Sequence, residues 1–220
     1  MYLIVDPIDG TTNFIKDYHT SCISVGIIND GIKAAGVVYN PYLNEMYYAI
    51  KGEGAFLNDK RIHVSDEPLS NGIVLFGTSP YYEELNEKSF EMAFDYFKKA
   101  LDIRRSGSAA IDLCSIAAGR AEVYFELRLS PWDYAAASLI LTEAGGYFQS
   151  QRQCCRWHFC NRSSCSKHTT KPQLFAGHSR EAYSLSLCGF MVLFPPHYFR
   201  VCKKLTGFFQ TFYLCLSSSA

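Results

Sequence analysis

The sequence predicts a layered α+β sandwich, in which helices pack on the faces of sheets. Three β-rich runs follow one another in the first third of the chain, separated by turn residues. Strand-like and helix-like runs then alternate. A meander followed by alternating elements is typical of sheets covered by helices. Because 48% of the 220 residues are hydrophobic, the chain has enough apolar side chains for a packed core.

The first segment predicts a strand, a turn and a helix. Residues 2–6 form a short apolar run that ends in a carboxylate, and residues 7–10 have turn chemistry. Thr11 or Thr12 can cap a helix that begins directly afterwards.

A meander of antiparallel strands is expected next. Its three strands are predicted at residues 21–29, 33–39 and 45–50. The connecting segments, residues 29–31 and 40–42, are hairpin signals. Further short strands are predicted at residues 55–57 and 73–78.

Helices and strands then alternate up to about residue 150. Apolar side chains recur at helical spacing within residues 83–101, at Phe90, Phe94, Phe97 and Leu101, and we expect this helix to lie on a sheet. The following elements are a predicted strand at residues 102–105, a buried helix at 109–118, a strand at 121–126 and a helix at 131–144. A proline begins the last helix and a glycine pair ends it.

Two carboxylates flank the turn after the first strand. Asp6 and Asp9 stand on either side of Pro7-Ile8, and the turn brings both toward one point. Two hard oxygen donors on a tight turn suit Mg²⁺. Residues 10–12 then present backbone N–H groups at a helix start, where an anion can bind. Neighbouring metal and phosphate sites are therefore predicted.

Each motif also has an ordinary structural explanation. An Asp-Pro-x-Asp-Gly string is more often a surface turn than a metal site. Asp133, at the start of the helix at residues 131–144, can either cap that helix or supply a third carboxylate. Gly107-Ser108 before a helix is commonly a simple cap. Taken one motif at a time, these alternatives stay open.

In combination, the motifs resemble those of the inositol monophosphatase family. Residues 6–14 (Asp-Pro-Ile-Asp-Gly-Thr-Thr-Asn-Phe) and 131–136 (Pro-Trp-Asp-Tyr-Ala-Ala) closely match its two signature motifs, in the right order. Residues 107–110 resemble its Gly-[Ser/Thr]-Ala-Ala turn, and residues 142–146 the segment after its second motif. The resemblance covers roughly residues 1–148. It implies an αβαβα sandwich of the inositol monophosphatase and fructose-1,6-bisphosphatase type, incomplete at both ends.

The resemblance implies a site for two or three Mg²⁺ ions. Asp6 and Asp9 would bind metal through their carboxylates, Ile8 through its carbonyl oxygen, and Asp133 would complete the second position. Asp6 would bridge the ions. Asp6, Asp9, Thr11 and Asp133 would be catalytic, with Thr11 holding the attacking water.

A substrate pocket is also implied by the resemblance. Glu126, seven residues before Asp133, matches the acidic residue that grips substrate hydroxyls. Gly10 and Thr11 would offer backbone N–H groups to the phosphate. The implied substrate-binding residues are Asp9, Gly10, Thr11, Gly107, Ser108, Ala109, Glu126 and Asp133.

The implied reaction is Mg²⁺-dependent hydrolysis of a small phosphate monoester, with inositol monophosphate as the leading candidate. Two ions would activate water and stabilise the leaving oxygen. Fructose-1,6-bisphosphatase and 3′-phosphoadenosine phosphate phosphatase activities are alternatives, as is a catalytically impaired fragment. Cys22 and Cys114 lie in apolar runs and are expected in the core, not as nucleophiles.

The chain is expected to be truncated at its N-terminus relative to the family. Family members carry two helices and a β-hairpin that end in a Glu-Glu pair before the first motif, whereas Met1 stands only five residues before Asp6. The glutamate would be a ligand of the first metal, so its absence predicts weak metal binding and slow hydrolysis.

Composition changes sharply near residue 150. Residues 1–150 contain 12 Lys or Arg and 20 Asp or Glu, whereas residues 151–220 contain 9 and 1, together with seven of the nine cysteines. We expect residues 149–220 to be an unrelated, poorly ordered tail produced by out-of-frame translation. The alternative is a zinc site, although the spacing fits no paired Cys-x₂-Cys knuckle. Its candidate ligands are Cys154, Cys155, His158, Cys160, Cys165 and His168.

Location and partners follow from charge and hydropathy. The net charge of zero favours neither nucleic acid nor membrane as a partner. The N-terminus has no signal-peptide pattern, so the cytoplasm is expected. Residues 183–194 are apolar, but Pro195-Pro196 interrupts them before a bilayer could be spanned. The expected partner is a small phosphorylated polyol; the resemblance allows a homodimer, and the missing N-terminal helices weigh against one.

Overall fold

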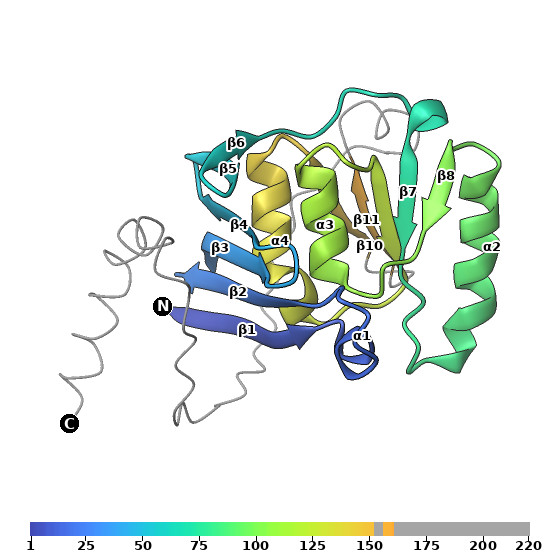
Figure 1. The fold of residues 1–220 in the computed structure, drawn as a ribbon, viewed down its shortest axis with the longest axis horizontal. Helices are drawn as coiled ribbons and strands as arrows, with labels where there is room; N and C mark the ends of the chain where they lie inside the picture. The colour runs from blue at the N-terminus through green and yellow to red at the C-terminus, as the bar shows by residue number, and fades with distance from the viewer. Residues whose placement is uncertain (152–155, 161–220) are drawn as a thin grey trace. The chain divides into compact units, whose positions relative to one another are not determined.

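A computed structural model of the protein describes residues 1–151 and 156–160, all of which belong to one compact unit, Met1–Thr169 (Figure 1). Within these residues a six-stranded sheet, a pair of helices, a five-stranded sheet and an outer helix are stacked in that order. The predicted layered α+β sandwich is confirmed. The described residues thus form layers in the order β, α, β, α.

The first sheet is an antiparallel meander with strand order β1-β2-β3-β4-β5-β6. Its strands are β1 (Tyr2–Asp9), β2 (Cys22–Asn29), β3 (Ile32–Asn40), β4 (Glu45–Ile50), β5 (Gly54–Leu57) and β6 (Lys60–Ile62). Both predicted hairpins are present. Asp30 and Gly31 have positive φ angles between β2 and β3, and the side chain of Asn40 accepts the backbone N–H of Tyr42 at 3.0 Å. β6 was not predicted, since three polar-rich residues give no strand pattern.

The second sheet has the order β10-β11-β9-β7-β8. Its strands are β7 (Ile73–Phe76), β8 (Asp102–Arg104), β9 (Val123–Glu126), β10 (Tyr147–Gln151) and β11 (Arg156–Cys160). β7 runs parallel to β8 and β9, whereas β11 is antiparallel to β9 and β10. The carboxyl ends of the parallel strands therefore meet at one edge of the sheet.

Four α-helices complete the described fold: α1 (Thr11–Ile15), α2 (Asn86–Phe97), α3 (Ala109–Ala117) and α4 (Pro131–Glu143), with 3₁₀ turns at Leu69–Asn71 and Glu83–Leu85. α3 and α4 lie between the two sheets (Figure 1). Small side chains let them fit there, since every α4 residue from Ala135 to Leu141 is buried. Cys22 and Cys114 are buried in this core, as expected from their apolar surroundings in the sequence.

Helix α2 covers the outer face of the second sheet, but through a different side from the one that its sequence pattern suggests. Ala93 is buried, and the Tyr96 ring stacks on Phe125 with the centroids 5.1 Å apart. The apolar residues that predicted the helix are largely exposed instead: Phe90 58%, Phe94 58%, Phe97 52% and Leu101 67%. Of these, Phe90 still meets the sheet, with its ring edge-on to that of Phe76 at a centroid distance of 6.1 Å. The side that packs on the sheet is formed by Ala93 together with the partly buried Met92 and Tyr96.

The predicted boundary at residue 148 falls inside β10, whose pairing with β11 carries the sheet to Cys160. The zinc candidates Cys154, Cys155, Cys165 and His168 lie outside the described residues, as does the apolar run at residues 183–194. The boundary, the tail and the zinc alternative all stay predictions. No helix among the described residues has the length and apolarity needed to cross a membrane.

The backbones of β3 and α4 approach very closely. A Cβ atom added to Gly36 would lie 2.7 Å from the carbonyl oxygen and 2.9 Å from the Cα of Ala136. On β2, a Cβ at Gly26 would lie 3.0 Å from the Cβ of Ala135. Two glycines facing two alanines thus set the distance between the meander and α4, the helix that carries Asp133.

Gly36→Ala is therefore expected to lower the free energy of unfolding by about 1–3 kcal/mol, because the backbone of α4 must move away from β3. Chemical denaturation would measure the loss. Gly31→Ala is the comparison: its Cβ would meet no atom, although its φ is +77°, so only the smaller backbone cost of roughly 1 kcal/mol is expected. Equal losses in the two variants would contradict the close approach.

Candidate metal centre

A bulge in β1 brings Asp6 and Asp9 to the same side of the strand. Asp6 lies opposite Ser24 and Asp9 opposite Cys22, so β1 uses three steps where β2 uses two. In a regular strand, side chains three positions apart point to opposite faces. The backbone N–H of Ile8 donates to Asp6 Oδ1 at 3.0 Å, which holds the bulged segment in place. The predicted turn is therefore a bulge within a longer strand.

The side chain of Asp9 is hydrogen-bonded to the start of α3. Its Oδ2 accepts hydrogen bonds from the Ser108 hydroxyl at 2.5 Å and the Ala110 backbone N–H at 2.9 Å. The N-terminal end of a helix favours a negative charge, so this contact stabilises the carboxylate. Ser108 also accepts the N–H of Ile111 at 3.3 Å. Ser108 is thus both a helix cap and a partner of the site.

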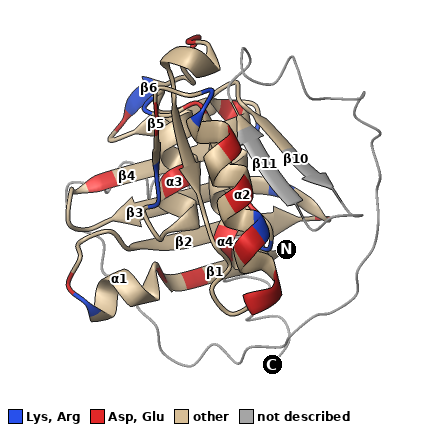
Figure 2. Cartoon of the chain, turned by 90° about the vertical axis from the view of Figure 1, so that its right-hand side faces the viewer, with Lys and Arg blue, Asp and Glu red and all other residues tan. Residues whose placement is uncertain are grey.

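Asp133 combines the two roles that the sequence presented as alternatives. Its Oδ2 accepts the backbone N–H of Ser130 at 2.6 Å, an interaction that caps the start of α4. It also belongs to the acidic cluster, since one carboxylate oxygen from each of Asp6, Asp9 and Asp133 lies within 4.8 Å of the others. A carboxylate has two oxygens, so the cap does not exclude the cluster. Figure 2 shows acidic segments on β1 and at the start of α4.

The electrostatics of this cluster fit a cation. Burial is the main cause that raises the pKa of Asp9 to about 6 and that of Asp133 to about 7, and it also raises the pKa of Asp6. Mutual repulsion adds to the shift at both Asp9 and Asp133. Three oxygen donors at this separation form a set suited to a hard divalent ion, which would relieve the repulsion.

Gly10 and Thr11 have conformations that the sequence did not reveal. Gly10 is the N-cap residue of α1 with φ 81°, and a Cβ there would lie 2.8 Å from the carbonyl oxygen of Thr20. No side chain caps α1, so the prediction of a Thr11 or Thr12 cap is wrong. Thr11 Oγ1 donates instead to the carbonyl oxygen of Ile8 at 2.9 Å. A carbonyl oxygen has two lone pairs, so this hydrogen bond uses only one of them. With five residues, α1 is too short to support the helix-dipole argument for a phosphate site.

Asn13 joins the two loops that border the cluster. Its Nδ2 donates to the carbonyl oxygens of Thr20 at 2.6 Å and Ser106 at 2.8 Å. A Cβ on Gly107, whose φ is 87°, would lie 3.0 Å from that nitrogen. The Gly107-Ser108 turn therefore packs directly against the end of β1. Asn13 was not assigned a role from sequence, although it lies within the first motif.

Glu126 lies at the carboxyl end of β9 and is buried. Its Oε1 accepts the backbone N–H of Ser79 at 2.9 Å and the Ser79 hydroxyl at 3.1 Å, and Tyr124 donates its hydroxyl to Oε2. Burial raises the pKa of Glu126, and its charge contributes to the raised pKa of Asp133. Glu126 thus lies near the acidic cluster, and its substrate role stays a prediction.

Cys22 is a neighbour of the cluster that sequence reasoning placed only in the core. Its thiol donates to Asp9 Oδ2 at 3.7 Å and lies 3.7 Å from Ser108 Oγ. The thiol is fully buried, and its pKa is raised well above the ordinary value by that burial. It therefore acts as a neutral hydrogen-bond donor to Asp9, a contact that no sequence pattern signals.

A comparison of the sequence with models of known protein families finds one match. The model described as "Inositol monophosphatase family" matches residues 1–183. The chain belongs to the inositol monophosphatase family. The matched range extends beyond residue 148, where the resemblance seen in the sequence ends.

Curated members and solved structures of the family agree with this assignment. A Nus factor SuhB from Pasteurella multocida is 43% identical over 144 residues, which are 65% of this chain and 54% of that protein. Inositol monophosphatase 2 from Saccharomyces cerevisiae is 43% identical over 154 residues, which cover 65% of this chain and 52% of that protein. The solved structure of an inositol monophosphatase from Anabaena has a TM-score of 0.67 and 33% sequence identity, and the match covers 73% of this chain and 67% of that one. The chain spans about half the length of the curated relatives it matches.

The acidic cluster predicts a gain of stability when one of its charges is removed. The pKa of Asp133 is about 7 in the folded protein, against about 3.9 in an unfolded chain. The free energy of unfolding therefore falls as the pH rises between these two pKa values, and the whole loss is present above the pKa of the folded protein. In metal-free protein at about pH 8, Asp133→Asn should raise the thermal midpoint by roughly 2–6 °C, because asparagine is neutral and can still accept the Ser130 N–H.

At about pH 4 the same substitution should change the midpoint little, because Asp133 is then protonated in the folded protein. Asp102→Asn is a suitable control, since the hydrogen bond from Arg104 lowers the pKa of that exposed carboxyl. It should not raise the midpoint at either pH. A destabilised Asp133→Asn protein at about pH 8 would contradict the electrostatic description.

Proposed function

We propose that the protein acts as a Mg²⁺-dependent phosphomonoesterase on a small polyol phosphate, with inositol monophosphate as the first candidate. One observation carries the proposal: carboxylate oxygens of Asp6, Asp9 and Asp133, which come from distant segments, lie within 4.8 Å of one another. Membership of the inositol monophosphatase family supports the same reaction class. The yeast relative named inositol monophosphatase 2 supports the choice of substrate.

Asp6, Asp9 and Asp133 would hold Mg²⁺, with the carbonyl oxygen of Ile8 as a further donor. When bound, the ion would supply positive charge to polarise the phosphate and lower the pKa of water. The chain's own contribution is to fix these donors beforehand. Ser108 and Ala110 orient Asp9, so little reorganisation is needed when the substrate arrives.

Substrate would be held by groups around the cluster. Backbone N–H groups of Gly10 and Thr11 are proposed to bind the phosphate, and the side chain of Thr11 to orient the attacking water. The Gly107–Ala109 turn would line the pocket, which its contact with Gly10 supports, since a Cβ on Gly10 would lie 3.3 Å from that of Ser108. Glu126 would accept a hydrogen bond from a substrate hydroxyl.

A second candidate is an interaction role without turnover. Two observations favour it: one relative is named a Nus factor, and α2 exposes much of the side chains of Phe94 and Phe97. The two candidate functions predict different effects of substitutions in the acidic cluster. Loss of carboxylates would abolish phosphate release but leave a protein contact on α2 intact.

The deciding experiment measures phosphate release from inositol monophosphate by the full chain, with and without Mg²⁺. Asp6→Asn and Asp133→Asn each remove a charged donor while keeping the side-chain shape. Either substitution should lower Mg²⁺-dependent release by at least about a hundredfold. Asp95→Asn, on the exposed side of α2, is the matched control and should retain activity.

Release that is unaffected by Asp6→Asn and Asp133→Asn would show that the cluster is not the catalytic centre. Absence of release from the original chain, across a panel of sugar and inositol phosphates, would reject the phosphatase proposal and leave the interaction role.

A further inference from the structure

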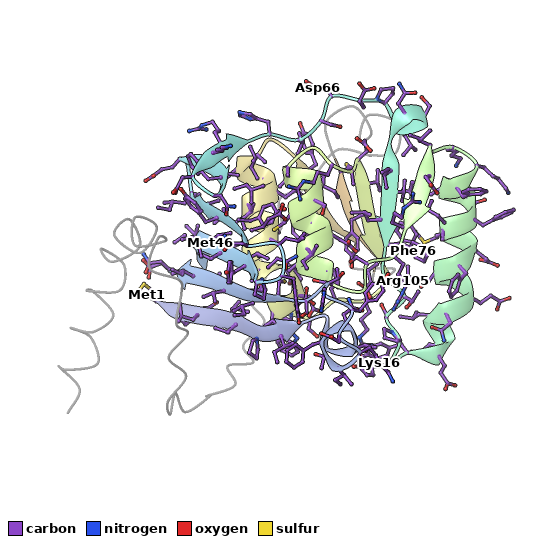
Figure 3. The ribbon with its side chains drawn as sticks, viewed as in Figure 1. Met1, Lys16, Met46, Asp66, Phe76 and Arg105 are labelled. Atoms are coloured by element: carbon purple, nitrogen blue, oxygen red, sulfur yellow. The ribbon has the colours of Figure 1, made fainter. Side chains whose placement is uncertain are left out.

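Ser79 lies just beyond the carboxyl end of β7, at the edge of the second sheet where the parallel strands end. β7 ends at Phe76, which pairs in register with Phe125 of β9. Figure 3 labels Phe76 on the side of the sheet where α1 lies. Glu126 follows Phe125 directly, so Ser79 and Glu126 lie at the same edge. Burial raises the pKa of Asp133 and the charge of Glu126 adds to that shift, so Glu126 is within electrostatic reach of the acidic cluster.

Three hydrogen-bond donors hold the Glu126 carboxylate. The backbone N–H and the hydroxyl of Ser79 donate to Oε1 at 2.9 and 3.1 Å, and Tyr124 donates its hydroxyl to Oε2. All three residues are buried. Burial raises the pKa of Glu126, and the hydrogen bonds from Tyr124 and Ser79 act against that shift. A carboxylate has about four acceptor positions, so these donors leave one position on Oε2.

The backbone at Ser79 has an unfavourable conformation for a residue with a side chain. Its φ of 47° lies in the left-handed region, which favours glycine. The Ser79 hydroxyl also accepts the backbone N–H of Arg128 at 3.1 Å, and the Arg128 carbonyl oxygen, 3.0 Å away, is a second acceptor for its single proton. Ser79 is therefore either a structural link to the chain after β9 or a clamp on Glu126. Uncommon backbone conformations of this kind cluster at functional sites, which favours the clamp.

We propose that Ser79 positions Glu126 to accept one ring hydroxyl of the substrate, and that it thereby sets a preference for polyol phosphates over phosphate monoesters without hydroxyl groups. The inference rests on the proposed phosphatase function and on the role proposed there for Glu126. Because Ser79 holds Oε1 against rotation, the remaining acceptor position on Oε2 is fixed before the substrate arrives. A substrate hydroxyl then binds without the cost of ordering its acceptor. Ser79 acts through Glu126 and is thus a positioning residue.

Inositol monophosphate and cyclohexyl phosphate isolate this effect, because they share a six-membered ring and one phosphate and differ in the ring hydroxyls. The full chain should have the lower KM for inositol monophosphate. Ser79→Ala should raise that KM roughly fivefold to tenfold and leave kcat within about twofold. Both constants for cyclohexyl phosphate should stay within about twofold, because this compound has no hydroxyl for Glu126 to accept. Steady-state phosphate release measures all four constants.

Ser79→Gly separates the hydroxyl from the backbone strain. Glycine also lacks the hydroxyl, but it adopts the left-handed conformation at no steric cost, so this variant should unfold at a higher denaturant concentration than Ser79→Ala. Its KM for inositol monophosphate should nevertheless match that of Ser79→Ala. A KM that follows stability instead, with Ser79→Gly close to the original chain, would overturn the proposal and indicate a purely structural link.

A double-mutant cycle with Glu126→Gln tests whether Ser79 acts through Glu126. Glu126→Gln alone should raise KM for inositol monophosphate. Adding Ser79→Ala should then change this KM by less than about twofold, because the positioned charge is already absent. Independent effects of the two substitutions would overturn the proposal. Ser89→Ala is the matched control and should change neither KM, since Ser89 is also buried and its hydroxyl donates to the carbonyl oxygen of Leu85 at 2.8 Å, away from Glu126.

Calorimetric titration in the presence of Mg²⁺ separates this inference from the proposed reaction. If nothing is hydrolysed, but inositol monophosphate binds about fivefold more tightly than cyclohexyl phosphate and Ser79→Ala removes most of that difference, the positioning role stands and the phosphatase proposal falls. If both compounds are hydrolysed and Ser79→Ala leaves KM unchanged for each, the reaction stands and the positioning role falls. Failure of both compounds to bind overturns both.

Discussion

The contact between the Asp9 carboxylate and the first turn of α3 is the constraint on which the site depends. Hydrogen bonds from Ser108 and Ala110 hold a buried charge that would otherwise be costly, and they connect β1 with the central helical layer. The bulge in β1 then places Asp6 beside Asp9. The hydrogen bonds and the bulge together therefore position the two carboxylates of β1.

The third carboxylate depends on how closely a helix approaches the meander. Gly26 and Gly36 leave room for the backbone of α4 against β2 and β3, so that Asp133 at its first turn reaches the end of β1. The result is an electrostatically unfavourable cluster, because burial and repulsion raise the pKa of Asp9 and Asp133. Strain of this kind is typical of a functional site, where a bound cation would offset the cost.

Sequence periodicity and turn chemistry predicted the meander, the alternating elements and the α4 boundaries, because these features are local. The motif resemblance brought Asp6, Asp9 and Asp133 together as candidates. The bulge and the Gly10 cap were not predicted, because a bulge depends on cross-strand register and a left-handed glycine leaves no periodic signal. The buried side of α2 was not predicted either, because Ala93 and Tyr96 pack on the sheet while the more apolar Phe94 and Phe97 are exposed.

The central claim is that these three carboxylates form one cation site, and anomalous scattering from crystals soaked in Mn²⁺ tests it most directly. Mn²⁺ takes the same hard oxygen ligands as Mg²⁺ and can be located by its own signal. The account predicts an anomalous peak within bonding distance of Asp6, Asp9 and Asp133, and loss of that peak in Asp9→Asn. Strong peaks elsewhere, with none between these carboxylates at millimolar Mn²⁺, would contradict it.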